Sequence, residues 1–231
     1  MSEIKVSQND NRKSRLEIVI AADKSNSGKT ILTCGMLEYL RRQGYSPAAF
    51  KCGPDYIDTM YHRSVEGVDS HNLDLYLADE DTVRALYERY SDGHDAVVIE
   101  GVMGFYDGVG GTSQASTYDL SRTLDIPVLY VIDAEDIPDL TAVKDDISAV
   151  FLNKCSADDH ARIREIIESE YGIPIAGYLP CTDHADLGSR HLGLLTAAEI
   201  EDLSKRIAEI ADMLGDNVDQ IVLKRLFSDS R

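Results

Sequence analysis

Short apolar segments alternate with longer amphipathic segments along this chain, and that alternation restricts its fold more than any other feature. Six segments have the length and β-branched content of buried strands: LEIVIA (16–21), SPAAFK (46–51), DAVVIEG (95–101), PVLYVIDA (127–134), ISAVFLNKC (147–155) and PIAGYLP (174–180). Helical patterns cover 28–45, with Gly44 as the stop signal, and 79–93, 113–124, 157–172 and 196–227. Such an order predicts one α/β domain over residues 15–231, in which helices cover both faces of a mostly parallel sheet.

The first strand-to-helix junction reads ADKSNSGKT (22–30) and resembles a phosphate-binding loop of the P-loop NTPase type. Main-chain N–H groups of the loop, from Lys24, Ser25, Asn26, Ser27 and Gly28, would surround the phosphates of a nucleotide at the positive end of the helix. In this pattern Lys29 reaches the β- and γ-phosphates and Thr30 holds Mg²⁺. Asp23 stands where the usual pattern has glycine, so an ordinary strand-to-helix turn is the alternative.

Composition excludes several other classes of protein. The 231 residues include 41 acidic and 23 basic side chains, a net charge of −18, which disfavours nucleic acid as a partner. Four scattered cysteines without a CxxC pair disfavour a zinc site and suit a reducing cytoplasm. The sequence has no apolar run of membrane-spanning length, and polar residues 1–14 are expected to form a flexible tail.

Several strings give a specific family resemblance. FKCGPDYIDTMYH (50–62) and VVIEGVMGFYDG (97–108), with NLDLYL, PVLYVIDA, LNK and SRHLGLLTAAE (189–199), resemble the synthetase domain of cobyrinic acid a,c-diamide synthase. The chain also resembles the enzyme that amidates nickel-sirohydrochlorin and, more distantly, dethiobiotin synthetase. The resemblance implies that ATP phosphorylates a tetrapyrrole carboxylate, and that ammonia then displaces phosphate to give an amide. Separately, KSNSGKT resembles the phosphate loop of a dimeric P-loop group whose extra lysine, here Lys24, reaches a partner's nucleotide.

The resemblance also assigns roles to residues at the ends of the predicted strands. It implies that Lys29 and Lys51 shield phosphate charge, and that Thr30, Asp55 and Glu100 bind one Mg²⁺, an ion that prefers oxygen ligands. Thr30, Asp55 and Glu100 lie after three different strands, whose carboxyl ends meet at the ligand-binding edge of a parallel sheet. Asn153 in LNK resembles the family's adenine-contacting asparagine, since an amide both donates and accepts hydrogen bonds.

Each of these residues has a structural alternative. Lys24 and Lys51 would then be solvated lysines, Asp55 and Asp58 would stabilise a turn after Gly53-Pro54, and Asn153 would cap a strand end. Glu100 would be a buried carboxylate that needs only a structural partner. Five further residues match the family. The sequence gives no role for Asn72 and Asp74, and it does not decide between a functional and a structural role for Asp133, Arg190 and His191.

Three departures from the family leave other functions open. The chain stops about where a glutaminase domain would begin, and no cysteine stands in a glycine-flanked nucleophile turn, so the nitrogen donor would be free ammonia or a separate glutaminase subunit. Only AEDIPDLTAVKDD connects the strands ending at Asp133 and beginning at Ile147, so a helix there would be stunted or replaced by a loop. Lys24 is the third departure. The alternatives are a dimeric ATPase that acts as a nucleotide switch and a dethiobiotin-synthetase-like ligase; a homodimer is expected.

Overall fold

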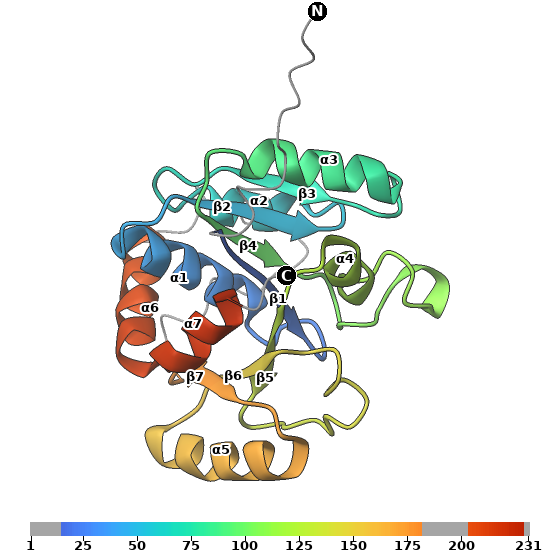
Figure 1. Cartoon of the computed structure of the whole chain (residues 1–231). Coiled ribbons are helices and arrows are strands. Elements are labelled where there is room, and N and C mark those ends of the chain that lie inside the picture. Colours follow the sequence, from blue (N-terminus) through green and yellow to red (C-terminus); the bar gives the residue numbers. More distant parts are fainter. Residues whose placement is uncertain (1–14, 182–202, 229–231) are drawn as a thin grey trace, which may run out of the picture.

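A sheet of seven parallel strands lies at the centre of the computed structural model, which describes residues 15–181 and 203–228 (Figure 1). The strands follow the order β3-β2-β4-β1-β5-β6-β7. Their bounds are β1 (Leu16–Ala22), β2 (Pro47–Cys52), β3 (Ser70–Leu73), β4 (Ala96–Glu100), β5 (Val128–Asp133), β6 (Ala149–Asn153) and β7 (Ile175–Tyr178). The predicted α/β class and the parallel sheet are confirmed.

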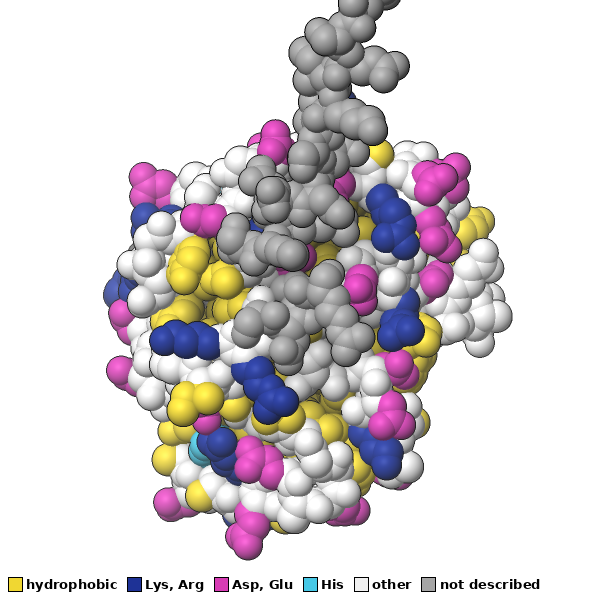
Figure 2. Space-filling view, in the orientation of Figure 1, with side chains coloured by type: hydrophobic (Ala, Val, Ile, Leu, Met, Phe, Trp, Pro, Cys, Tyr) yellow, Lys and Arg dark blue, Asp and Glu magenta, His cyan; other side chains and the backbone are white. Residues whose placement is uncertain are grey.

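Helices cover both faces of the sheet because successive residues of a strand point to opposite sides. Their bounds are α1 (Lys29–Arg42), α2 (Tyr56–His62), α3 (Glu80–Ser91), α4 (Thr117–Leu124), α5 (Ala157–Tyr171), α6 (Leu203–Asn217) and α7 (Gln220–Ser228), with a 3₁₀ turn η2 (Val109–Gly111). On β1, Ile18 and Ile20 face the core formed with α1, α6 and α7, while Val19 and Ala21 face the core formed with α3, α4 and α5 (Figure 1). Acidic and basic side chains are interspersed on the face shown in Figure 2.

Strand β1 occupies the point where the order of the sheet reverses. The chain runs from β1 to β2 and β3 on one side, then returns through β4, and afterwards adds β5, β6 and β7 on the other side. In open parallel sheets the crevice outside the carboxyl end of such a strand binds ligands. The loop after β1, which carries the expected phosphate-binding residues, lies at this crevice.

Two short elements, α2 and β3, escaped prediction. Strand β3 has four residues, SHNL, at the edge of the described sheet, and it pairs there with β2. Helix α2 has seven residues, and the Asp55 carboxylate caps it by accepting hydrogen bonds from the N–H groups of Ile57 and Asp58. Both elements are too short to show a clear hydrophobic period.

The connection between β5 and β6 contains turns and no helix along residues 134–148, all of which are described. This confirms the predicted loss of a full crossover helix. Leu140 and Val143 are buried in the core beneath the connection, so two apolar side chains cover this part of the sheet in place of a helix.

The C-terminal region forms two helices rather than one continuous helix. Asp219 separates α6 from α7, and its Oδ1 accepts hydrogen bonds from the N–H groups of Ile221 (3.0 Å) and Val222 (3.2 Å), which starts the second helix. The first part of the predicted helical segment, 196–202, and the predicted N-terminal tail, 1–14, lie outside the described residues. Along the described parts of the chain, every helix is too short or too polar to span a bilayer.

Candidate functional site

The loop between β1 and α1 has the backbone shape that phosphate binding requires. Gly28 is the N-cap of α1 with φ of 100°, and Asn26 has φ of 66°, so both lie in the left-handed region. A Cβ atom on Gly28 would lie 2.3 Å from Asn153 Nδ2, so only glycine fits between the loop and the end of β6. The first N–H groups of α1 have no acceptor within the helix and face this loop, where an anion would satisfy them.

Asp23 stabilises the loop from the position where the usual pattern has glycine. The Ser27 hydroxyl, which is buried, donates to Asp23 Oδ1 at 2.8 Å and also lies 3.2 Å from the main-chain oxygen of Lys24. The aspartate therefore contributes a hydrogen bond inside the loop. Lys24, Ser25 and Asn26 are exposed at its outer side.

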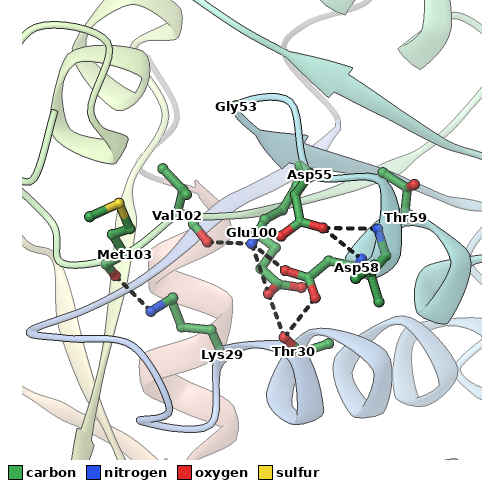
Figure 3. A network of polar contacts seen from close by, with 12 residues as sticks. Lys29, Thr30, Gly53, Asp55, Asp58, Thr59, Glu100, Val102 and Met103 are labelled. Atoms are coloured by element: carbon green, nitrogen blue, oxygen red, sulfur yellow. Dashed lines mark hydrogen bonds and ion pairs between the residues drawn. The ribbon is translucent and has the colours of Figure 1, made fainter. Parts of the chain in front are cut away.

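Lys29 is buried and points across the loop (Figure 3). Its Nζ donates to two main-chain oxygens, those of Lys24 at 2.9 Å and Met103 at 2.7 Å. Burial and the nearby Lys51 ammonium lower the pKa of Lys29 to about 8. Neither acceptor carries a charge, so a phosphate at this loop would stabilise the ammonium form more strongly than the two carbonyl groups do.

Lys24 forms an ion pair with Asp136, in the connection between β5 and β6, and lies 3.6 Å from Asp23 Oδ2. Half of the Lys24 side chain is exposed. Solvent screens ion pairs between exposed side chains, which contribute little free energy, so Lys24 can exchange Asp136 for another partner. The expected contact of Lys24 with a partner subunit's nucleotide remains a prediction.

Four polar side chains meet at the carboxyl ends of β2 and β4 (Figure 3). The Thr30 hydroxyl donates to Glu100 Oε1 at 2.7 Å and lies 3.5 Å from Asp58 Oδ1. Lys51 Nζ lies 2.6 Å from Asp58 Oδ2 and 3.1 Å from Glu100 Oε1, and it donates to the main-chain oxygen of Gly101 at 2.8 Å. The structure therefore joins the phosphate loop to a buried cation and two carboxylates.

The charges in this cluster support one another. Burial alone would raise the pKa of Glu100, but the Lys51 ammonium and a hydrogen bond from His62 hold that pKa well below its usual value. Burial opposes the charge on Lys51 too, yet Glu100 and Asp58 raise its pKa above the usual range. Burial and the neighbouring Glu100 carboxylate raise the pKa of Asp58 to about 6. Glu100 and Lys51 therefore both keep their charged forms in the site.

Asp55, predicted to bind Mg²⁺, lies at the start of α2, where its Oδ1 accepts from the N–H groups of Ile57 at 2.9 Å and Asp58 at 3.1 Å. Of the two aspartates after β2, it is Asp58 whose carboxylate has contacts with Thr30 and Lys51. Asp55 as a metal ligand remains a prediction, and the structure adds Asp58 as a candidate.

His62 is a further buried residue of the site that the sequence interpretation missed. Its Nε2 lies 2.7 Å from Glu100 Oε2, and its Nδ1 lies 2.9 Å from the Ser70 hydroxyl. The signal for it was present in DTMYH, because Asp58 and His62 are four residues apart and share one helical face. Without a prediction of α2, that spacing had no meaning.

Asn153 lies at the end of β6, next to the phosphate loop, and its expected contact with a base remains a prediction. Its Nδ2 donates to the main-chain oxygen of Ser27 at 3.1 Å, and its Oδ1 is buried without a hydrogen-bond partner among the described residues. A buried acceptor of this kind suits the exocyclic amino group of adenine. Next to it, Lys154 Nζ lies 2.5 Å from Asp133 Oδ2, so Asp133 is an ion-pair partner at this edge.

The structure gives local roles to two residues that matched the family without one. Asn72 Nδ2 donates to the main-chain oxygens of Gly53 at 2.7 Å and Asp55 at 2.8 Å, which fixes the loop before α2. Asp74 Oδ1 accepts from the N–H group of Tyr76 at 2.8 Å and so closes the turn after β3. Arg190 and His191 lie outside the described residues.

The donor set at the cluster fits Mg²⁺. A hydroxyl from Thr30 and carboxylates from Glu100 and Asp58 or Asp55 are oxygen ligands, and Glu100 is ionised. Within 15–181 and 203–228, no three His, Cys, Asp or Glu side chains are grouped to hold a metal ion by themselves. Mg²⁺ commonly binds proteins through one or two carboxylates and keeps several waters.

The chain is similar in sequence to known proteins. Three cobyrinate a,c-diamide synthases are similar over most of this chain: 36% identity over 88% of it for Listeria innocua, 38% over 91% for Clostridium acetobutylicum and 36% over 89% for Thermoplasma acidophilum. These matches cover 48%, 51% and 48% of the relatives, so the chain spans about half their length.

A solved structure supports the fold alone. Chloroplast FtsY from Physcomitrella patens superposes with a TM-score of 0.54 at 12% identity, over 85% of this chain and 65% of that one. The domain family described as "CobQ/CobB/MinD/ParA nucleotide binding domain" matches residues 18–194, which include the phosphate loop, the carboxylate cluster and Asn153. The chain therefore belongs to the CobQ/CobB/MinD/ParA nucleotide binding domain family.

Proposed function

We propose that this protein is the synthetase part of an ATP-dependent amidoligase that activates a tetrapyrrole side-chain carboxylate as an acyl phosphate. One observation carries the proposal: the phosphate loop is joined through Thr30 to Glu100, and through Glu100 to the buried Lys51. A lysine held at a phosphate site by buried carboxylates suits the meeting of two anions, substrate carboxylate and γ-phosphate. The similarity to cobyrinate a,c-diamide synthases supports the choice of substrate class.

The residues would divide the work as follows. Lys29 and the loop N–H groups would bind the β- and γ-phosphates, and Asn153 would accept a hydrogen bond from the adenine. Thr30, Glu100 and Asp58 or Asp55 would hold Mg²⁺, which supplies positive charge next to the phosphates. Lys51 would orient the carboxylate and the transferred phosphoryl group.

The reaction then has two displacements. A carboxylate oxygen of the substrate attacks the γ-phosphorus, the bond to the bridging oxygen breaks, and ADP leaves. The nitrogen lone pair of ammonia attacks the acyl carbon, phosphate leaves with the bonding electrons, and the nitrogen loses a proton. Phosphorylation is needed because a carboxylate is a poor electrophile and has no adequate leaving group.

We further propose that the nitrogen comes from free ammonia or a separate glutaminase subunit, and that the protein works as a homodimer in the cytoplasm. All four cysteines, each within the described part of the chain, are free thiols, which agrees with a reducing compartment.

Phosphate release from ATP, measured with and without an acceptor, tests the proposal. Mg²⁺, ammonia and cobyrinic acid should give amide and phosphate in equal amounts, with little release when the acid is omitted. Rapid phosphate release that is the same with and without every acceptor would instead support a dimeric ATPase that acts as a nucleotide switch. Release stimulated only by a small amino-acid carbamate would support a ligase that closes a ring, as dethiobiotin synthetase does.

A further inference from the structure

His62 connects two strands of the sheet through its two ring nitrogens. It lies in the last turn of α2, and it contacts Ser70 at the start of β3 and Glu100 at the end of β4. Strand β2 runs between these strands, with Ala49 paired to Ser70 and Lys51 paired to Glu100. The imidazole therefore crosses β2, and it lies on the same face of the sheet as the contacts that the Lys51 ammonium group makes with Asp58 and Glu100.

The chemistry of the partners fixes the roles of the two nitrogens. Glu100 is an ionised carboxylate and can only accept, so Nε2 of His62 carries the hydrogen and donates to Oε2. In the neutral ring Nδ1 is then an acceptor, and the Ser70 hydroxyl donates to it. Both His62 and Ser70 are fully buried, so water cannot replace either hydrogen bond.

The two oxygens of Glu100 consequently have separate partners. Oε2 faces His62, whereas Oε1 faces Thr30 and Lys51. Without the imidazole, the carboxylate could rotate and present both oxygens to the Lys51 ammonium, which lies 3.1 Å from Oε1. A donor behind Oε2 prevents that rotation and leaves Oε1 directed at the phosphate loop.

We propose that His62 is a positioning residue for the divalent-cation site, in which it holds Glu100 so that Oε1 faces the ion that accompanies ATP. The inference rests on the proposed function, because it takes Glu100 as a ligand of that ion. Ser70 supports His62 by fixing its tautomer. Hydrogen-bond partners of metal ligands typically change metal affinity by about 10- to 100-fold when they are removed.

The test measures binding of Mn²⁺ to the full chain by electron paramagnetic resonance, with saturating adenylyl imidodiphosphate and no acceptor. His62→Leu removes the donor and should weaken Mn²⁺ binding by at least about tenfold. His62→Gln has an amide nitrogen near the position of Nε2 and should recover most of the affinity. Both variants lose the contact with Ser70, so a difference between them reports the donor to Glu100 rather than general stability.

Two serine variants provide a matched pair that does not depend on the folding of His62→Leu. Ser70 and Ser91 are both fully buried, and the Ser91 hydroxyl donates to the main-chain oxygen of Tyr87 at 2.7 Å, far from the site. Ser70→Ala and Ser91→Ala should lower the melting temperature by similar amounts. Only Ser70→Ala should weaken Mn²⁺ binding, by several-fold, while Ser91→Ala should leave binding unchanged.

The outcomes separate this inference from the proposed function. If His62→Leu folds and binds Mn²⁺ with the affinity of the wild type, His62 does not have the proposed role. If His62→Leu does not fold, wild-type Mn²⁺ affinity in Ser70→Ala leads to the same conclusion. Equal losses in His62→Leu and His62→Gln that follow their melting temperatures would also overturn it. Absence of ordered Mn²⁺ in the wild-type complex, or an unchanged signal in Glu100→Gln, would refute the proposed metal site itself.

Discussion

Lys51 and Glu100 are register partners on the neighbouring strands β2 and β4, and Lys51 Nζ lies 3.1 Å from Glu100 Oε1. Their side chains are only 3% and 1% exposed, so each charge depends mainly on the other rather than on solvent. Removal of one partner from a buried ion pair leaves an uncompensated charge and typically costs about 3–5 kcal/mol. The remaining Asp58 contact, at 2.6 Å from Lys51, should limit that cost for substitutions of Glu100.

The carboxylate of Glu100 should matter more for turnover than for nucleotide binding. Glu100→Gln keeps the shape of the side chain but removes an ionised oxygen ligand, so Mg²⁺-dependent turnover should fall at least about tenfold while ATP affinity changes less. Steady-state assays across a range of Mg²⁺ concentrations, with calorimetry of ATP binding, check this. Full activity at ordinary Mg²⁺ concentrations would show that Glu100 is not a ligand.

Asp55→Asn is the companion variant in the same assay. Asparagine is as good an N-cap as aspartate, so α2 should keep its capping hydrogen bonds and the fold should survive. A loss of Mg²⁺-dependent turnover would therefore report the charge of Asp55 at the metal, as predicted. Activity like that of the wild type, together with a loss in Asp58→Asn, would transfer the role to Asp58.

Nucleotide affinity should depend on pH through Lys29. Its pKa is lowered to about 8, so above that pH the unliganded lysine loses its proton and must regain it to pair with phosphate. The affinity for Mg²⁺-ATP should be flat between the Asp58 pKa of about 6 and the Lys29 pKa of about 8, and then fall about tenfold per pH unit up to the ordinary lysine pKa. Calorimetry at several pH values measures this.

Lys29→Ala is the control for that pH dependence. It should abolish tight ATP binding without unfolding the chain, and the residual affinity should lack the step near pH 8. The same step in Lys29→Ala would show that another group causes it, and unchanged affinity at pH 7 would remove Lys29 from the phosphate site.

Sedimentation equilibrium with and without ATP tests whether the protein forms the predicted homodimer. Dimers are expected, at least with ATP, if Lys24 leaves Asp136 to reach a partner's nucleotide. Asp136→Asn weakens the hold on Lys24 and should favour the dimer, whereas Lys24→Ala should disfavour it. Monomers in both conditions, for the wild type and both variants, would contradict the prediction.

Ammonia should support amide formation, while glutamine alone should not. Glutamine hydrolysis needs an activated thiolate, but burial raises the pKa of Cys52 to about 12 and that of Cys155 to about 11, and it also raises that of Cys34. The rate with ammonium salts should increase with pH as more free ammonia forms. Equal rates with glutamine as the only donor would reveal a glutaminase site.

The sequence was sufficient for the main elements because their signals are local. The apolar run of β1 followed by Gly28-Lys29-Thr30 specifies a strand, a phosphate loop and a helix within 30 residues. The shortened connection after Asp133 could likewise be counted in the sequence. These features need no knowledge of the distant residues that pack on them.

The rest of the site depends on contacts between segments far apart in the chain. Asp55 and Asp58 look alike in GPDYID, and only the fold of α2 shows that the first caps the helix while the second approaches Thr30. His62 acquires its role from Ser70 and Glu100, which lie 8 and 38 residues away. A four-residue strand such as β3 is specified by its neighbour β2, not by its own sequence.

The central claim is that the substrate carboxylate itself attacks ATP, and oxygen-isotope transfer tests it most directly. Cobyrinic acid with ¹⁸O in its carboxylates would be amidated with ATP, Mg²⁺ and ammonia, and the released phosphate analysed by mass spectrometry. The account predicts one ¹⁸O atom in the phosphate for each amide formed, because the acyl phosphate keeps the carboxylate oxygen when ammonia displaces phosphate. Amide formation with unlabelled phosphate, or ATP hydrolysis without label transfer or amide, would contradict it.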